Sequence, residues 1–423
     1  ESEVRQYYKK ILWELRSGTG DLLYHSPKIT DQVAILHSQN SLIANFIKQK
    51  KSDYYAKELS FARAFEDIGI AYRFIVPDEI KSGVLKNFKA LILPEASALS
   101  DGEIQSIRAF VQNGGILIAD YEPGIQNEVC NTRETPALND LFGITSRRFT
   151  LRRVESHGIP GMELHQAGYG VKTVDGKALC KAVTDKGEVP LVITRNYGKG
   201  KTVFLNFVPE YNQTRNHGKD HGFLCLLDSL LNLKSIAQVK SKMPVMHSYY
   251  RNGGNLYIAL LPVPPRGEWE QMTLADLQDK KFETPLCTAE KGYLYDVRNG
   301  KYLGHGNTFD LTLVPGDGTL LALLPYEVRG IHIDLPEKAK RGEIVKLKVK
   351  VQADAATGHH VLLITVTKPD GGNSLEYRTI RNTKNGSDEF QIPFALNDPE
   401  GEWKVCIKDA ASGVVETRII NLK

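Results

Sequence analysis

The sequence predicts a multidomain α/β plus all-β protein, in which a doubly wound parallel sheet precedes two antiparallel β-sandwiches. Two patterns support this fold class. In the first half of the chain, short continuous apolar runs alternate with helical segments, as in buried parallel sheets. After Met243 the helical period largely disappears, and short alternating strands follow one another between Gly and Pro residues, which indicates antiparallel sandwiches.

The first half contains at least four apolar strands that alternate with helices. The expected strands span residues 32–37, 72–76, 90–94 and 116–120, and the expected helices span residues 41–48, 53–68 and 101–111. A hairpin around residues 196–200 and a helix at residues 222–233 follow. This order predicts a doubly wound, flavodoxin-like sheet. The first thirty residues add an amphipathic helix with Tyr8, Ile11, Leu12 and Leu15 near one face.

The last hundred residues predict an immunoglobulin-like sandwich. Seven short strands are expected between residues 330 and 422, at the spacing typical of that fold. The usual Cys–Trp–Cys pattern is missing because Trp403 and Cys406 share one strand, so a fibronectin-like or macroglobulin-like variant is expected. Trp403 is expected to anchor the core of this domain.

Charge and composition exclude several classes of partner. The chain has 54 basic and 50 acidic residues without a long basic block, so nucleic acid is not an expected partner. It has no run of about 18 apolar residues and no apolar signal core at its charged start, so we expect a soluble chain without a membrane span. The five cysteines are widely spaced and do not pair with histidines at zinc spacing, which favours buried free thiols. No cofactor is indicated.

Acidic residues follow two neighbouring strands of the predicted sheet. Glu95 and Glu122 are expected at the carboxyl edge, where α/β folds bind ligands. They are the best carboxylate pair for a glycosidase mechanism, although loop carboxylates at strand ends more often cap backbone amides. In glutamine-amidotransferase-like folds a Cys or Ser nucleophile occupies the turn where Asp120 and Tyr121 stand here. An Asp nucleophile is chemically possible, but a hydrogen-bonding role in the turn is favoured.

The densest ionisable cluster precedes the helix at residues 222–233. His217 and His221, with Asp220 between them, have a spacing that can bind a metal or supply a general base. The alternative is a polar loop in which Asp220 caps the helix and the histidines are solvated, and we favour this alternative.

Aromatic residues in the second half are candidates for sugar binding. Trp269 lies in a polar context, and Tyr293 and Tyr295 alternate on one predicted strand, which puts both on one face. Such rings can stack on sugar C–H faces, but aromatic residues on one sheet face more often belong to a core.

Several segments together resemble the middle of β-galactosidases of glycoside hydrolase family 42. They are residues 14–42, 91–121 and 196–207, followed by the closing helix of that domain. In that family a catalytic (β/α)8 barrel precedes an amidotransferase-like trimerisation domain without amidotransferase activity, and then a β-sandwich. The resemblance implies four parts: residues 1–30 as the end of a barrel, 31–236 as the trimerisation-type domain, 237–326 as a β-sandwich and 327–423 as an additional immunoglobulin-like domain.

The resemblance implies a non-catalytic accessory region that assembles an oligomer and frames a carbohydrate site. A barrel needs about 250 residues that this chain does not have, so no residue inherits the catalytic glutamates of the family. The loops at residues 38–40, 95–97 and 121–125 are the expected walls of the site. Expected partners are carbohydrate and either further copies of the chain, as a trimer, or an upstream barrel.

Two other classes of function stay open. One is a stand-alone carbohydrate-binding or cell-surface protein, and the other is a hydrolase whose carboxylates lie at the edge of the α/β sheet. The compartment is not determined by the cysteines. The terminal immunoglobulin-like module favours a periplasmic or secreted location over a cytoplasmic one.

Overall fold

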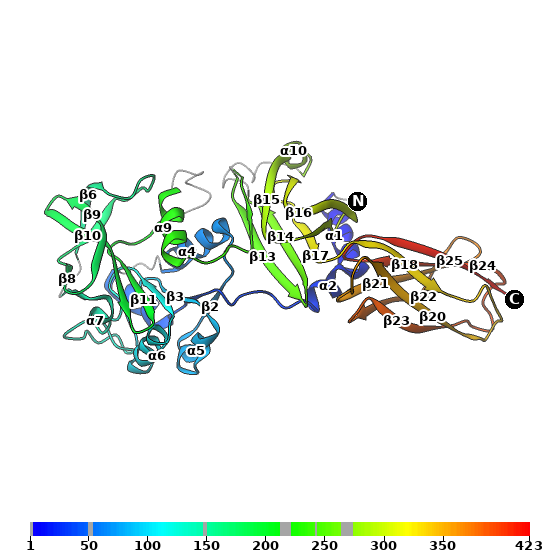
Figure 1. Cartoon of the computed structure of the whole chain (residues 1–423), viewed down its shortest axis with the longest axis horizontal. Coiled ribbons are helices and arrows are strands. Elements are labelled where there is room, and N and C mark those ends of the chain that lie inside the picture. Colours follow the sequence, from blue (N-terminus) through cyan, green and yellow to red (C-terminus); the bar gives the residue numbers. More distant parts are fainter. Residues whose placement is uncertain (1–2, 50–53, 147–149, 212–220, 242, 264–273) are drawn as a thin grey trace. The chain divides into compact units, whose positions relative to one another are not determined.

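The computed structural model describes residues 3–49, 54–146, 150–211, 221–241, 243–263 and 274–423, which divide into two compact units (Figure 1). The α/β unit comprises Thr30–Met246 and Pro262–Lys280. The β unit comprises Glu1–Ile29, His247–Leu261 and Lys281–Lys423. Each unit is described by itself below.

The α/β unit is built on a nine-stranded sheet in the order β2-β1-β3-β4-β11-β10-β9-β6-β7. Its parallel half consists of β1 (Val33–Leu36), β2 (Tyr72–Ile75), β3 (Ala90–Leu93), β4 (Ile116–Ala119) and β11 (Gly200–Leu205). Its antiparallel half consists of β10 (Gly187–Tyr197), β9 (Lys177–Thr184), β6 (Thr150–His157) and β7 (Gln166–Tyr169). A small separate sheet pairs β5 (Ile144–Thr145) with β8 (Lys172–Thr173). The four parallel strands predicted from apolar runs are confirmed.

Helices lie on both faces of the parallel strands (Figure 1). Alternate residues of β1 point to opposite sides, so Val33 belongs to one core and Ala34 to the other. One core includes α4 (Tyr54–Ile68) and α9 (His221–Leu231), and the other includes α5 (Pro77–Lys81), α6 (Asp101–Gln112) and α7 (Asn139–Phe142). β1, β3 and β4 are therefore almost entirely buried, which explains their continuous apolar sequence, whereas β2 at the edge of the sheet is only partly buried.

Local sequence sets the limits of α6. Ser100 forms a capping box with Glu103, in which the Ser100 hydroxyl accepts from the Glu103 N–H and the Glu103 carboxylate accepts from the Ser100 N–H. The helix ends before Gly115, where an added Cβ would lie 2.3 Å from the Phe110 ring. The next strand, β4, therefore begins directly against the helix it follows.

The predicted hairpin at residues 196–200 is confirmed. β10 and β11 pair antiparallel, with Tyr197 opposite Gly200, and β11 continues alongside β4 in parallel. Gly200 lies so close to α6 that an added Cβ would be 2.2 Å from the Val111 carbonyl oxygen. The glycines of this turn are thus required by close packing of the backbone.

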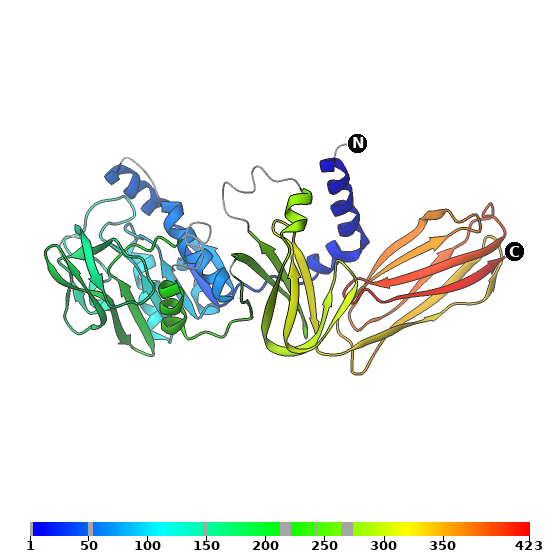
Figure 2. The ribbon, with the colours of Figure 1, turned by 90° about the horizontal axis from the view of Figure 1, so that it is seen from above.

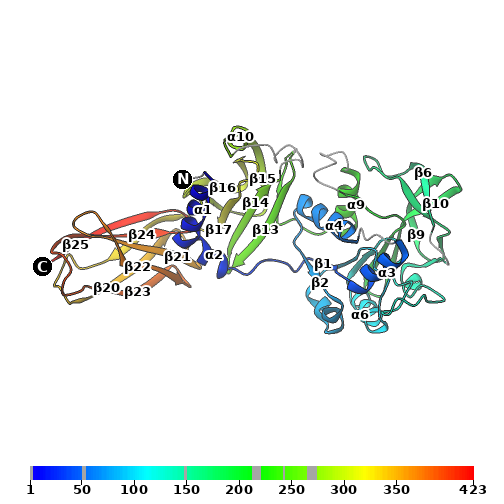
Figure 3. The same cartoon turned by 180° about the vertical axis from the view of Figure 1, so that it is seen from behind.

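The remaining elements of the α/β unit are short, apart from one helix. They are α3 (Gln39–Gln49), the 3-10 helix η2 (Val84–Asn87), β12 (Ala237–Val239) and α10 (Leu274–Asp279). α3 connects the end of β1 to the region before α4 (Figure 3).

The β unit begins with helices that pack against its sheets (Figure 2). These are α1 (Glu3–Glu14), the π-helical turn η1 (Leu15–Thr19) and α2 (Gly20–Tyr24). The predicted apolar face of α1 is largely exposed, since Tyr8, Leu12 and Leu15 are on the surface, and only Leu22 of this region enters the core. Arg298 holds α1 in place, with its Nε 3.0 Å from Glu14 and Nη1 2.6 Å from Asp317.

An antiparallel sheet in the order β16-β15-β17-β14-β13 follows in the β unit. Its strands are β13 (Val245–Asn252), β14 (Asn255–Pro262), β15 (Phe282–Asp296), β16 (Lys301–Leu313) and β17 (Thr319–Leu324). β15 and β16 form a long hairpin, and β17 pairs with both β14 and β15. The switch from helical to alternating sequence after Met243 therefore marks a real change of structure.

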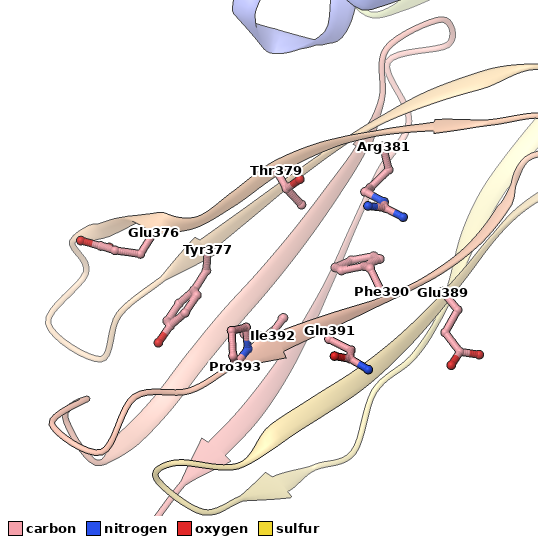
Figure 4. A pocket seen from close by; sticks show the side chains of 9 residues that line it. All are labelled: Glu376, Tyr377, Thr379, Arg381, Glu389, Phe390, Gln391, Ile392 and Pro393. Atoms are coloured by element: carbon pink, nitrogen blue, oxygen red, sulfur yellow. The ribbon is translucent and has the colours of Figure 1, made fainter.

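The last hundred residues form two further sheets. One contains β18 (Val328–Asp334), β20 (Ile344–Ala353) and β23 (Ser387–Pro393), and the other contains β19 (Lys338–Ala339), β25 (Val415–Leu422), β24 (Gly401–Asp409), β21 (His360–Thr367) and β22 (Asn373–Thr383). Trp403 is fully buried, as predicted, and its Nε1 donates to the Pro399 carbonyl. A hollow of about 390 Å³ lies between β22 and β23, lined by Tyr377, Arg381 and Phe390 among others (Figure 4).

A buried polar network joins this region to the preceding sheet. The His360 ring bridges Asp409 Oδ1 and the Tyr326 hydroxyl, at 2.9 Å each, and the Tyr326 hydroxyl donates to Asn255. Burial alone would raise the pKa of Asp409, but His360 and Ser412 outweigh it and hold that pKa below its ordinary value. The network is fully satisfied, so it serves as an internal connection of the β unit.

Candidate functional site

Acidic residues meet at the carboxyl edge of the α/β sheet. β3 and β4 are parallel neighbours, with Leu93 opposite Ala119. The structure therefore places Glu95 beside the turn that contains Asp120 and Glu122. This edge is where open α/β sheets bind ligands.

Two of these residues have an unusual backbone. Glu95 has φ 38° and Glu122 has φ 60°, in the left-handed region that side chains other than glycine rarely adopt. Both residues are buried. Such a conformation costs on the order of 1 kcal/mol or more and tends to occur at functional sites. The turns after β3 and β4 are therefore the strained positions of this sheet edge.

Asp120 is fully buried between these two turns. One carboxylate oxygen, Oδ1, accepts from the Glu95 N–H, and Oδ2 finds no hydrogen-bond partner among the described residues. Burial raises the pKa of Asp120 well above its ordinary value, and the charge of Glu95 raises it further. The raised pKa disfavours the ionised carboxylate that a nucleophile requires, so these surroundings favour the hydrogen-bonding role in the turn.

Glu122 is neutralised by a helix of the same unit. Lys48, near the end of α3, donates to its carboxylate, and the Lys48 ammonium lies 5.6 Å from the centre of the Tyr121 ring. Burial raises the pKa of the Tyr121 hydroxyl, and Glu122 adds to that effect. Glu122 is therefore held in an ion pair rather than presented to solvent.

A polar cavity of about 630 Å³ opens beside Glu95. Lys57 on α4 lies on its wall, with Nζ 3.4 Å from Oε1 of Glu210. Its lining carries both charges and includes Arg153, Glu163, His165 and Gln166. Glu122 lies outside this lining. The two carboxylates predicted as a pair thus have different surroundings, one on a cavity wall and one bound to Lys48.

A third strand end carries a polar pair that sequence reasoning missed. His37 follows β1, and its Nδ1 lies 2.9 Å from Oε1 of Glu58 on α4. Burial raises the pKa of Glu58, although His37 opposes this effect. The Ser38 N–H donates to the Tyr54 hydroxyl nearby. The signal available in the sequence was a histidine, His37, directly after an apolar strand. Its partner Glu58 lies on α4, the second helix after that strand.

The predicted metal candidates are not brought into a site. His217 lies outside the described residues, and His221 is the exposed first residue of α9. Within the described ranges, no group of three or more His, Cys, Asp or Glu side chains can hold a metal ion. The five cysteines are free thiols, four partly buried and Cys225 exposed. The described ranges also contain no helix long and apolar enough to cross a bilayer.

The predicted sugar-binding residues separate in the structure. Trp269 lies outside the described residues. Tyr295 is only 2% exposed and its hydroxyl accepts from the Val328 N–H, so its assignment as a surface platform is wrong: it is a core residue. Tyr293 instead stacks on His305, with ring centres 4.2 Å apart, and donates to Asp354.

Comparison with known proteins identifies the α/β region. Residues 31–218 match the family model of the β-galactosidase trimerisation domain. Residues 31–218 are therefore similar to a β-galactosidase trimerisation domain, and this region is called the trimerisation domain below. The acidic strand ends at Glu95, Asp120 and Glu122 all lie inside this trimerisation domain, as do Lys48 and His37.

Curated relatives agree with this assignment. The chain is 26% identical over 208 residues to β-galactosidase BgaB from Geobacillus sp. (strain Y412MC61), and the same values hold for the enzyme from Geobacillus kaustophilus. Each match covers 44% of this chain and 29% of the relative. The chain thus matches less than a third of the length of these relatives.

Solved structures share the architecture beyond the trimerisation domain. The β-galactosidase from Bacillus circulans sp. alkalophilus aligns with a TM-score of 0.56 at 16% identity, covering 74% of this chain and 44% of that one. The α-L-fucosidase isoenzyme 2 from Paenibacillus thiaminolyticus aligns with a TM-score of 0.51 at 14% identity, covering 74% of this chain and 51% of that one. At these identities the likeness concerns the fold alone: a mostly sheet, multidomain chain resembling β-galactosidase structures.

Proposed function

We propose that this chain is the non-catalytic accessory part of a β-galactosidase-like glycoside hydrolase, which assembles a trimer and frames a carbohydrate site. The observation that carries the proposal is the match of residues 31–218 to the trimerisation domain. Oligomer assembly is the role that this domain supports most directly. In this proposal, the catalytic activity and the choice of sugar belong to a larger protein of which this chain is a part.

The proposed organisation has four parts. Residues 1–30 would end a barrel, 31–236 form an amidotransferase-like, flavodoxin-like domain, 237–326 a β-sandwich and 327–423 an immunoglobulin-like domain. Parallel strands with helices on both faces support the second part, and two packed antiparallel sheets support the last. The exposed side chains Tyr8, Leu12 and Trp13 on α1 support an upstream partner domain for the first.

The proposed frame of the carbohydrate site is the carboxyl edge of the α/β sheet. Its cavity of about 630 Å³ falls in the usual range for small-molecule sites, roughly 300–1,000 Å³. Its carboxylates, amide and cations offer donors and acceptors for sugar hydroxyls, while the loops at 38–40, 95–97 and 121–125 surround the strand ends. Polar lining of this kind suits a wall that contacts sugar without cleaving it.

A hydrolase with its carboxylates at this edge is the second candidate. Glu95 on the cavity wall and the strained backbone at Glu95 and Glu122 favour it. The Lys48–Glu122 ion pair and the raised pKa of Asp120 argue against it, because Lys48 occupies the Glu122 carboxylate and burial disfavours the ionised form of Asp120. Replacing Glu95→Gln would abolish turnover in a hydrolase of this type and leave an accessory domain unchanged.

A stand-alone carbohydrate-binding protein is the third candidate. This candidate is favoured by exposed rings on the β15–β16 hairpin, where Tyr302 and His305 lie beside Tyr293. Such a protein would bind glycans without cleaving them, which glycan-array binding would detect.

The experiment that tests the proposal combines intact mass with activity. The mass of the natural gene product is compared with the 47.2 kDa of this chain, and the product is assayed with nitrophenyl-galactoside. A product larger by a barrel, with galactosidase turnover, is expected. A product of matching mass without turnover would overturn the accessory role and leave a glycan-binding or assembly protein.

A further inference from the structure

Two consecutive helices of the trimerisation domain expose their large apolar side chains. Ile43, Phe46 and Ile47 lie at i, i+3 and i+4 on α3, so they share one face of that helix. Phe46 is 57% exposed and Ile47 is 66% exposed. Tyr55 and Leu59, at i and i+4 on α4, are exposed as well. We call these five side chains the α3/α4 apolar face.

The side of α3 that faces the protein is largely polar. Ser41 and Asn45 of α3 are buried, together with the small Ala44. A helix that packs against a core normally buries its apolar stripe and exposes its polar one. On α3 this pattern is reversed, whereas α4 buries Phe61 and Phe65 in the core and exposes Tyr55 and Leu59 as well.

Several buried polar groups on these helices have specific partners, which hold the helices in this orientation. The Ser41 hydroxyl donates to the Ala98 carbonyl at 3.2 Å, and Glu58 pairs with His37. Glu66 accepts from the Tyr72 hydroxyl at 2.8 Å. Turning α3 to bury its exposed apolar side chains would leave Ser41 without its partner, which costs about 1–3 kcal/mol.

Charge at the rim of the apolar face is also reduced. Lys48 follows Ile47 directly, yet its ammonium turns inward to Glu122 and the Tyr121 ring. A charge that is already paired is less costly to cover than a free one. The end of α3 can therefore lose water without leaving an unpaired cation.

We propose that the α3/α4 apolar face is the surface through which one copy of this chain binds the next. The proposal rests on the proposed oligomerisation, because the face lies inside the domain that matches the trimerisation model. Stable interfaces bury about 800 Å² on each partner around an apolar centre. Five large side chains on two consecutive helices supply such a centre, and neighbouring polar residues supply the rim.

The test places a charge on the face in the full chain. Phe46→Asp and Ile47→Asp are compared with the wild type by light scattering coupled to size-exclusion chromatography. Loss of a central interface residue is expected to raise the dissociation constant at least ~30-fold, so each variant should elute as a monomer at concentrations where the wild type is a trimer.

A matched control separates the face from a general effect of added charge. Val174→Asp introduces the same charge at another exposed apolar position of the same domain and should leave the trimer intact. Circular dichroism spectra of all three variants at room temperature should match the wild type, because the replaced side chains are exposed and the fold of the single chain is unchanged. A wild-type monomer at every concentration would overturn the oligomerisation itself. A wild-type trimer that persists in both Phe46→Asp and Ile47→Asp would overturn only the assignment of the face.

Discussion

Helices α6 and α3 belong to the same domain and present their apolar side chains in opposite directions. On α6, Ile104, Ile107 and Phe110 are buried against the sheet, and a capping box fixes the start of the helix. On α3, Ser41 and Asn45 are buried, while Phe46 and Ile47 face outward. An apolar stripe on a helix therefore does not by itself show that the sheet of the same chain covers it, and for α3 we propose a second copy as the covering element.

The largest expected effect concerns the two apolar stripes. Ile107→Ala on α6 should lower the free energy of unfolding by about 2–5 kcal/mol, because it leaves a cavity in the core. Phe46→Ala on α3 should change that free energy by less than about 0.5 kcal/mol, because the side chain is exposed in the single chain. Urea denaturation of both variants in an Ile47→Asp background removes any contribution from assembly.

Equal destabilisation by the two substitutions would contradict the comparison, since Phe46 would then belong to a core of the single chain. Unchanged stability in Ile107→Ala would also contradict the comparison, since Ile107 would then not belong to the core.

The next effect is the pH dependence of stability caused by Asp120, at the carboxyl edge of the α/β sheet. The raised pKa of Asp120 means that the folded chain binds more protons than the unfolded chain above about pH 4, so wild-type stability falls as pH rises through that range. Asp120→Asn removes this penalty and keeps an oxygen to accept from the Glu95 N–H. The variant should gain stability relative to the wild type between pH 4.5 and pH 8, by about 1.4 kcal/mol for each unit of pKa shift.

Urea midpoints at the two pH values provide the measurement. A stability difference between Asp120→Asn and wild type that stays constant across this range would show that Asp120 is ionised in the folded chain.

A smaller effect on stability is expected from the capping box at the start of α6. Ser100→Ala should lower stability by about 1 kcal/mol, because the Glu103 N–H at the start of α6 loses its acceptor. Ser106→Ala, at an exposed position of the same helix, is the matched control and should change little, since its hydroxyl only bonds back to the Gly102 carbonyl. Thermal denaturation of both variants measures the two changes in stability. Equal losses of stability in Ser100→Ala and Ser106→Ala would contradict a stabilising role of the cap.

The smallest expected effect is that of the Lys48–Glu122 ion pair. Lys48 is about half exposed, so Lys48→Ala should cost at most about 1 kcal/mol. A double-mutant cycle with Glu122→Gln isolates the pair, and the coupling should shrink in high salt. A coupling energy well above that value, unchanged by salt, would mean that the pair is more deeply buried than the structure places it.

Much of the trimerisation domain follows from its sequence. Continuous apolar runs predicted β1 to β4 within one or two residues, because strands buried on both faces admit few polar side chains. The order of strands also predicted that Glu95 and Glu122 would follow neighbouring strands, since parallel strands end at one edge. The family resemblance rested on the same segments.

Other features depend on contacts that no local pattern encodes. Periodicity gives a helix an apolar face but does not say whether that face turns to the sheet, so neither the exposed stripe of α1 nor that of α3 was predicted. Tyr295 was a candidate for sugar binding with a core position as the alternative, and the structure buries it with its hydroxyl bonded to the Val328 N–H, because strand alternation alone cannot tell which face is covered. The His37–Glu58 pair joins residues 21 apart and appears only when α4 folds back on β1.

Sedimentation equilibrium of the wild-type chain tests most directly whether the chain assembles, which an interface at the α3/α4 apolar face requires. A mass three times the 47.2 kDa of the chain is expected, falling toward the single-chain mass on dilution. A mass of 47.2 kDa at the highest concentration reached would contradict it, because the apolar face would then remain in water without a partner.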